Sequence, residues 1–165
     1  FTVSSKGLKE KVLGNKTTSQ MISGGFTTNN LGNEVGIQIK IKKSPTYIED
    51  FNVSIVQNDF DKLKFRLNFY NMKDGLPNEI ILDENIIIES EIKNGILTVD
   101  LRGYNIVVYE DFFVSLEWIE ELGDTDGLLF SAGFLGSPII SRSTSQADWE
   151  KIGAVSIGFN VTAKY

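Results

Sequence analysis

The chain contains no cysteine and no histidine among its 165 residues. Without cysteine it cannot form disulfides, thiolate nucleophiles, iron–sulfur clusters or cysteine-ligated zinc sites. Without histidine it cannot build a Ser-His-Asp or Cys-His catalytic site, and it lacks the usual ligand of zinc, copper and non-haem iron. An enzyme would have to depend on carboxylates, lysine, tyrosine or a Ser-Lys pair. We therefore expect a protein that is not an enzyme and that holds no cofactor.

The chain also lacks an uninterrupted apolar segment of membrane-spanning length, and it has no surplus of basic residues. Charged residues interrupt the densest apolar stretch, residues 79–88, so we expect no membrane insertion. The 16 Lys and Arg residues are outnumbered by 22 Asp and Glu residues, which gives a net charge of -6. An acidic surface repels the phosphates of nucleic acids, so we expect no nucleic-acid partner.

The sequence does have the composition of a folded globular protein. Hydrophobic residues make up 41% of it and charged residues 23%, and the length fits a single domain over residues 1–165. Residues 16–33 are rich in Ser, Thr, Asn and Gly, so we expect a long loop there. The best helix candidate is residues 6–13, although Gly7 and Gly14 weaken it.

Alternation of apolar and polar residues dominates the rest of the chain, and this period of two is typical of strands with one buried face. The clearest examples are residues 35–42, 51–55, 63–69, 112–118 and 155–165. A helix would scatter these apolar positions, because its side chains repeat every 3.6 residues. Less regular strands are predicted at residues 86–89, 96–101, 105–109, 128–135, 138–142 and 149–152.

Two of these less regular strands, residues 138–142 and 149–152, are predicted to pair as a hairpin. Residues 86–89 are apolar on both faces, which favours a central strand. Turn pairs such as Asn94-Gly95 separate the runs at the spacing of about 8–12 residues that is typical of sandwiches and barrels. We therefore predict an all-β fold, a two-sheet antiparallel sandwich with jelly-roll or Greek-key topology.

A sheet edge is predicted near residues 38–43, which contain three lysines. Charged side chains, lysine above all, protect exposed strand edges from pairing with other chains. We interpret Lys40, Lys42 and Lys43 as such protection.

Four segments resemble a known group of β-sandwich domains. They are FRLNFY at residues 65–70, VDLRGYNI at 99–106, FFVSLEWIE at 112–120 and TSQADWEKIG at 144–153. With the alternating last strand, they resemble the β-sandwich portion of carboxypeptidase-regulatory-like envelope proteins of Gram-negative bacteria. They are also similar to the closing strands of galactose-binding-like jelly rolls. This resemblance, over roughly residues 31–165, implies a noncatalytic cell-envelope or secreted module. It implies no peptidase activity, since a zinc carboxypeptidase needs histidine ligands.

Aromatic side chains offer the best candidates for a ligand site. The set is Trp118, Trp149, Tyr104, Tyr109 and Tyr47. An exposed aromatic ring complements the C–H face of a sugar, and nearby polar groups bind its hydroxyls. Trp118 lies on the apolar face of its strand, so we expect it in the core. Trp149 follows a polar hairpin and is the better surface candidate, with Arg142 and Asp148 as polar partners. The alternative is that Trp149 only covers one end of the sandwich.

Acidic residues supply two weaker candidates. Asp124 and Asp126, just before Gly127, have the two-residue spacing of calcium ligands. The full loop pattern would need a Glu six positions after Gly127, where the chain has Gly133. A solvated Asp-Gly turn explains the motif without a metal, and we predict no metal site.

Paired carboxylates are the second of these candidates. The adjacent pairs are Asp83-Glu84, Glu110-Asp111 and Glu120-Glu121. Two carboxylates that flank a glycosidic bond can hydrolyse it. Neighbouring residues of a strand point to opposite faces, so no such pair by itself forms a catalytic dyad.

Two functions therefore remain open. The first is a noncatalytic binding module whose partner is a glycan or a surface protein. The second is a structural or protein-interaction domain of a larger surface assembly, with no small-molecule ligand. Exposed aromatics on one concave face would favour the first, and an exposed strand edge on a smooth polar surface would favour the second.

Overall fold

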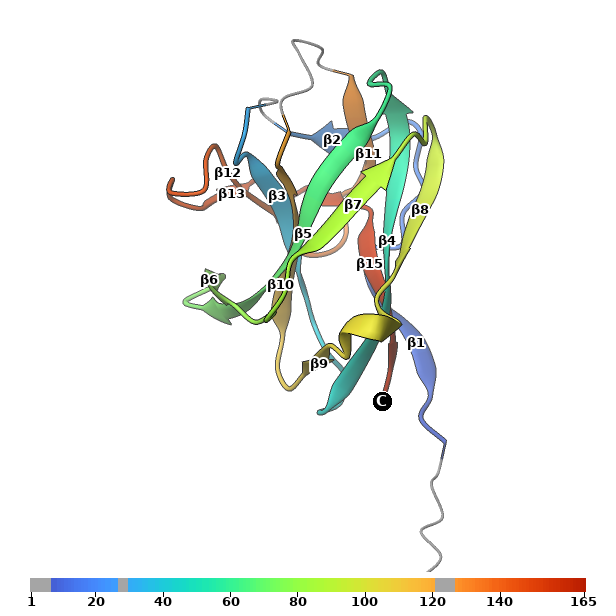
Figure 1. Cartoon of the computed structure of the whole chain (residues 1–165), viewed down its shortest axis with the longest axis vertical. Helices are drawn as coiled ribbons and strands as arrows, with labels where there is room; N and C mark the ends of the chain where they lie inside the picture. The colour runs from blue at the N-terminus through green and yellow to red at the C-terminus, as the bar shows by residue number, and fades with distance from the viewer. Residues whose placement is uncertain (1–6, 27–29, 121–126) are drawn as a thin grey trace, which may run out of the picture.

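The computed structural model describes residues 7–26, 30–120 and 127–165, and nearly all regular structure within them is β-strand. Strands β1 to β15 form two antiparallel sheets, and a single turn of 3-10 helix, η1 (Arg102–Tyr104), lies near one end (Figure 1). The predicted two-sheet antiparallel sandwich is confirmed. These ranges contain no helix that is long and apolar enough to cross a bilayer.

The first sheet has eight strands, with β1–β15–β4–β11–β14 as its main path. Strand β2 adds to β11, whereas β8 and β9 add to β4. The bounds are β1 (Glu10–Gly14), β2 (Ser23–Gly25), β4 (Thr46–Asn58), β8 (Gly95–Asp100), β9 (Val107–Val108), β11 (Leu128–Gly133), β14 (Ser156–Ile157) and β15 (Phe159–Lys164). Because β4 pairs with β15 and β11 on one side and with β8 and β9 on the other, it is the spine of this sheet.

The second sheet has seven strands in the order β13–β12–β3–β10–β5–β6, and β7 also pairs with β5. The bounds are β3 (Glu34–Ile39), β5 (Leu63–Lys73), β6 (Leu76–Ile80), β7 (Ile86–Ser90), β10 (Phe112–Trp118), β12 (Ile139–Arg142) and β13 (Glu150–Ile152). Strand β10 lies between β3 and β5. All its residues are buried, so its outward face is covered as well as its core face.

The apolar positions of the alternating strands fill the space between the two sheets. The large, fully buried side chains include Phe51, Phe65, Phe69, Phe112, Trp118, Phe130 and Phe159. Trp118 is 1% exposed, and its ring centroid lies 4.4 Å from that of Phe65. The prediction that Trp118 belongs to the core is confirmed.

One prediction about the N-terminal part is wrong. The helix candidate at residues 6–13 is not helical where the structure describes it, because Glu10–Gly14 form strand β1 and pair with β15. Tertiary pairing overrides the weak helix propensity of this glycine-flanked segment. In residues 16–33, predicted as a long loop, the described part is irregular apart from the short strand β2, which pairs with β11.

Two predictions about strand position are also wrong. Strand β7 is not central, because its only partner among the described strands is β5 and Ile87 is 43% exposed. Strand β3 is not at an edge, because it pairs with both β12 and β10. Its lysine neighbours Lys40, Lys42 and Lys43 follow its last residue. Both errors arise because sheet order depends on distant pairings rather than on the composition of one strand.

Gly36 of β3 marks a place where the backbone has no room for a side chain. A Cβ atom there would overlap the carbonyl oxygen of Val114 and lie 2.7 Å from a ring carbon of Phe113. We expect Gly36→Ala to lower the free energy of unfolding by about 1–3 kcal/mol, measured by denaturant titration. In the control Gly103→Ala, an added Cβ meets nothing within 4 Å. Equal losses in the two variants would contradict this account.

Candidate functional site

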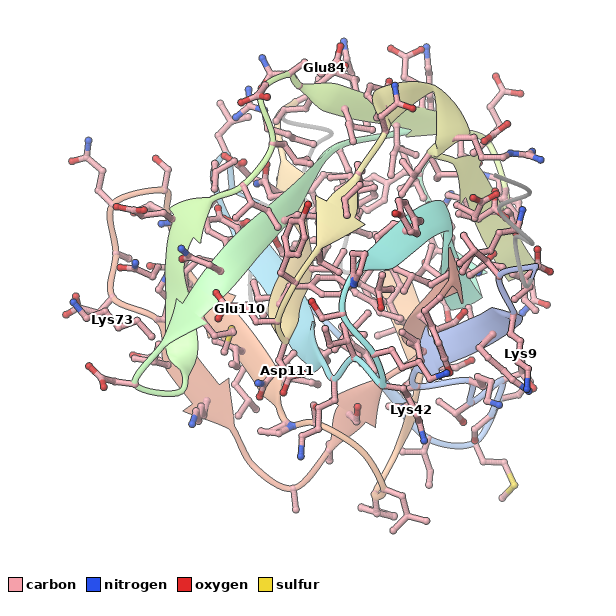
Figure 2. The ribbon with its side chains drawn as sticks, turned by 90° about the horizontal axis from the view of Figure 1, so that it is seen from below. Lys9, Lys42, Lys73, Glu84, Glu110 and Asp111 are labelled. Atoms are coloured by element: carbon pink, nitrogen blue, oxygen red, sulfur yellow. The ribbon has the colours of Figure 1, made fainter. Side chains whose placement is uncertain are left out.

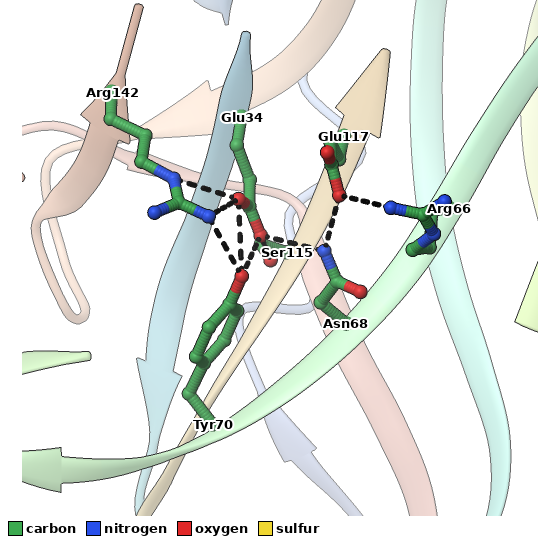
Figure 3. Close-up of polar contacts among 7 residues, drawn as sticks. All are labelled: Glu34, Arg66, Asn68, Tyr70, Ser115, Glu117 and Arg142. Carbon is green, nitrogen blue, oxygen red and sulfur yellow. Dashed lines mark hydrogen bonds and ion pairs between the residues drawn. The ribbon is translucent and has the colours of Figure 1, made fainter. Parts of the chain in front are cut away.

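The outward face of the second sheet carries a set of interacting polar side chains, which we call the polar network (Figure 3). Its members are Glu34, Arg66, Asn68, Tyr70, Ser115, Glu117 and Arg142. They come from the four neighbouring strands β12, β3, β10 and β5, whose other face lies in the core. Register brings them together, because Glu34 lies opposite Arg142 on one side and opposite Glu117 on the other.

Glu34 is the centre of the polar network and is fully buried. Its Oε1 accepts hydrogen bonds from Asn68 Nδ2 at 2.9 Å, Tyr70 OH at 2.9 Å and Ser115 Oγ at 2.5 Å. Its Oε2 accepts from Nε and Nη2 of Arg142 at 3.0 and 2.8 Å. A buried carboxylate is costly unless it is paired and hydrogen-bonded. Here both oxygens have several donors.

A second carboxylate extends the polar network across β10 and β5. Glu117, which is 7% exposed, accepts from Asn68 Nδ2 at 2.9 Å and from Arg66 Nη1 at 3.3 Å. The amide of Asn68 therefore bridges both carboxylates. Two carboxylates and two guanidinium groups balance in charge. The described side-chain hydrogen bonds of the polar network join its own members, which indicates that it holds four strands in register.

Two of the three residues predicted to bind a ligand meet on this same face. The guanidinium carbon of Arg142 lies 4.3 Å from the ring centroid of Trp149. The partly buried Trp149 also makes edge contacts with Tyr70 and Phe113, at 5.6 and 5.2 Å between ring centroids. Asp148 is exposed. Ligand binding by Trp149, Arg142 and Asp148 stays a prediction, since the contacts of the first two are with the protein itself.

Open space is found at another place, the end of the sandwich that Figure 2 shows from below. Two cavities of about 210 and 230 Å³ share Ile81 and Val107 in their walls, and we call the pair the end cleft. The first is lined by Ile81, Leu82, Asp83, Glu84, Ile86, Tyr104, Asn105, Ile106 and Val107. The second is lined by Asn71, Ile81, Val107, Val108, Tyr109, Glu110, Asp111 and Phe112. The end cleft therefore lies between the β6–β7 connection and the segment that carries η1 and β9.

The end cleft combines aliphatic walls with polar groups that the fold leaves unused. Tyr109 is 69% exposed. One oxygen of Asp111 accepts a hydrogen bond from the Ile41 amide at 2.9 Å. Among the described residues, no hydrogen bond or ion pair uses the carboxylates of Asp83, Glu84 or Glu110. The end cleft thus has free acceptors beside an apolar surface, as small-molecule sites do.

The sequence signals parts of the end cleft but not the cleft itself. Tyr104 and Tyr109 belong to the predicted aromatic set, and Asp83-Glu84 and Glu110-Asp111 are adjacent carboxylate pairs. Only the pairing of β9 with β4, and of β5 with β6 and β7, brings these segments together. No local pattern in the sequence indicates that these segments lie close together.

Comparison with protein-family models, curated proteins and solved structures found no match. The resemblance to carboxypeptidase-regulatory-like domains therefore stays an expectation. In the described ranges, no three Asp or Glu side chains lie close enough together to hold a metal ion. Asp124 and Asp126, the alternative calcium ligands, lie outside the described residues.

The buried position of Glu34 predicts a large loss of stability when its carboxylate is removed. Glu34→Ala leaves Arg142 without its ion-pair partner. It also removes the acceptor of Tyr70 and Ser115 and one of the two acceptors of Asn68. We expect the free energy of unfolding to fall by about 3–5 kcal/mol, measured by denaturant titration. The control Glu89→Ala removes two exposed ion pairs, with Lys62 and with Lys64, and should leave the unfolding midpoint nearly unchanged. A small loss in Glu34→Ala would contradict the central role of Glu34.

The polar network also predicts how stability depends on pH in alkali. Burial, and then the adjacent Glu34 charge, raise the pKa of Tyr70 far above its usual range. In the unfolded chain this phenol ionises at about pH 10, so above that pH the unfolded state binds fewer protons than the folded state. Stability therefore falls as pH rises, by about 1.4 kcal/mol per pH unit. In Tyr70→Phe, urea titrations between pH 9 and 11.5 should show a shallower fall. An unchanged slope would contradict this assignment.

Proposed function

We propose that this domain is a noncatalytic ligand-binding module of a secreted or cell-envelope protein, and that its end cleft takes a glycan. The observation that carries the proposal is the lining of the end cleft. There an exposed tyrosine ring and unused carboxylates border aliphatic walls. The cell-envelope or secreted location rests on the sequence resemblance alone.

A sugar suits this lining because it presents two kinds of surface. The C–H face of a pyranose packs on an aromatic or aliphatic surface, here Tyr109, Ile81 and Val107. Its hydroxyl groups donate to carboxylate and amide oxygens and accept from amide N–H groups. Each cavity is smaller than the roughly 300–1,000 Å³ of a drug-sized pocket, so each fits a single ring. Two adjoining cavities fit a short oligosaccharide.

A binding role, rather than catalysis, agrees with the residue types in the chain. The chain has no histidine and no cysteine, which removes the commonest general base and the most reactive nucleophile. Among the side chains that line the end cleft, the acid–base groups are four carboxylates and two tyrosine phenols. Their oxygens can accept hydrogen bonds from the hydroxyl groups of a sugar.

A protein-interaction domain is the second candidate, and the edge strand β8 favours it. Among the described strands, β8 pairs only with β4, so its other edge offers free backbone groups to an added strand. Ile96 on this strand is 57% exposed and would pack against a partner.

We expect Tyr109→Ala to abolish glycan binding, because it removes the aromatic surface at the rim of the end cleft. The measurement is saturation-transfer NMR with soluble oligosaccharides of glucose, galactose, glucosamine and N-acetylglucosamine. The matched control is Phe134→Ala, since Phe134 is 68% exposed, as Tyr109 is at 69%, and does not line the end cleft. Signals that persist in Tyr109→Ala, or no signal with any glycan, would contradict the proposal, and the latter would favour the interaction domain.

A further inference from the structure

The negative charge of the end cleft indicates which saccharides it binds. We infer that the end cleft selects a cationic saccharide, one with free amino groups such as an oligomer of glucosamine, over its neutral N-acetylated counterpart. This inference rests on the proposed function and names the ligand class of the same site.

The lining of the end cleft is charged with one sign only. Four carboxylates line it, those of Asp83, Glu84, Glu110 and Asp111, and none of the lining residues is a lysine or arginine. The chain as a whole has a net charge of -6, so the long-range field has the same sign. A hollow with apolar walls and charge of one sign concentrates the field and attracts the opposite charge.

These charges are available to a ligand because the fold does not neutralise them. No ion pair of the described residues includes any of the four carboxylates. Asp111 has one oxygen engaged by a backbone amide, and its second oxygen takes part in no hydrogen bond among the described residues. In Figure 2, Glu110 and Asp111 lie between Lys73 on one side and Lys42 on the other, and neither lysine lines the cleft.

The placement of the carboxylates suits an extended organic cation better than a metal ion. Asp83 and Glu84 border the first cavity, whereas Glu110 and Asp111 border the second. The described residues contain no converging set of three that could hold a metal. A saccharide that spans both cavities would place an ammonium group near a carboxylate in each. The aliphatic walls shared by the cavities, Ile81 and Val107, would contact its rings.

An amino saccharide and its N-acetylated form differ only at the amino group, so comparing them tests whether the carboxylates of the end cleft contribute to binding. Acetylation keeps the ring and its hydroxyls but converts the ammonium group into a neutral amide. If ring packing and hydroxyl contacts alone decide affinity, the two forms bind alike. If the carboxylates take part, the amino form binds more tightly, and salt weakens its binding by screening.

The experiment is isothermal titration calorimetry of the chain at pH 6, where amines are protonated, with the trimers of glucosamine and of N-acetylglucosamine. We expect the glucosamine trimer to bind roughly threefold to tenfold more tightly, since exposed ion pairs contribute modestly. That advantage should shrink when salt is raised from about 0.02 to 0.5 M. The double variant Glu84→Gln with Glu110→Gln should bring the two trimers close to equal affinity.

The matched control is Glu91→Gln with Glu150→Gln, which changes the net charge equally at two exposed residues that do not line the end cleft. It should keep the preference. Equal affinity of the two trimers for the unmodified chain would overturn the inference and leave the proposed function standing. A preference that survives in the Glu84 and Glu110 double variant, or disappears equally in the control, would also overturn it. Binding of neither trimer would overturn the inference, and failure of every glycan in the panel would overturn the proposed function too.

Discussion

The burial of one carboxylate, that of Glu34, constrains half of the sandwich. A charge with no access to water must have donors on every side, and its donors come from β12, β5 and β10. These strands must therefore stay in one order and one register around β3. A slip of one residue in any of them would turn its donor toward the core, because strand side chains alternate between faces. The polar network thus specifies the strand order and register of the second sheet, which apolar side chains specify less strictly because one can replace another.

The same constraint explains why the outward face of this sheet is covered. Tyr70, Phe113 and Ile140 form a second, small apolar cluster there, with Trp149 packed against it. The β5–β6 and β12–β13 hairpins approach one another, since Gly75 lies close to the side chain of Lys151. This cover keeps water from the Glu34 ion pair and strengthens it. It also engages Trp149 and Arg142 in contacts within the protein.

The core strands could be predicted from the sequence because their signal is local. Residues 63–69 and 112–118 each show a full alternating pattern, and the structure places them in β5 and β10. The polar network could not be predicted, because Glu34 and Arg142 lie far apart in the chain and look like ordinary charged residues at strand ends. The exposure of Tyr109 had no local signal either. It follows β9, a strand of two residues, which is too short for a periodic pattern.

Substitutions in the polar network and in the end cleft have different effects on the fold. A substitution in the polar network disturbs four strands at once, since its members share donors and acceptors. The residues of the end cleft lie mostly in connections between strands. Strand β9 pairs with β4 over only two residues, and residues 82–85 belong to no strand. Side chains there can change without breaking the ladder of hydrogen bonds. The polar network therefore holds one sheet in register, while the connections at the end of the sandwich keep carboxylates that join no ion pair of the described residues.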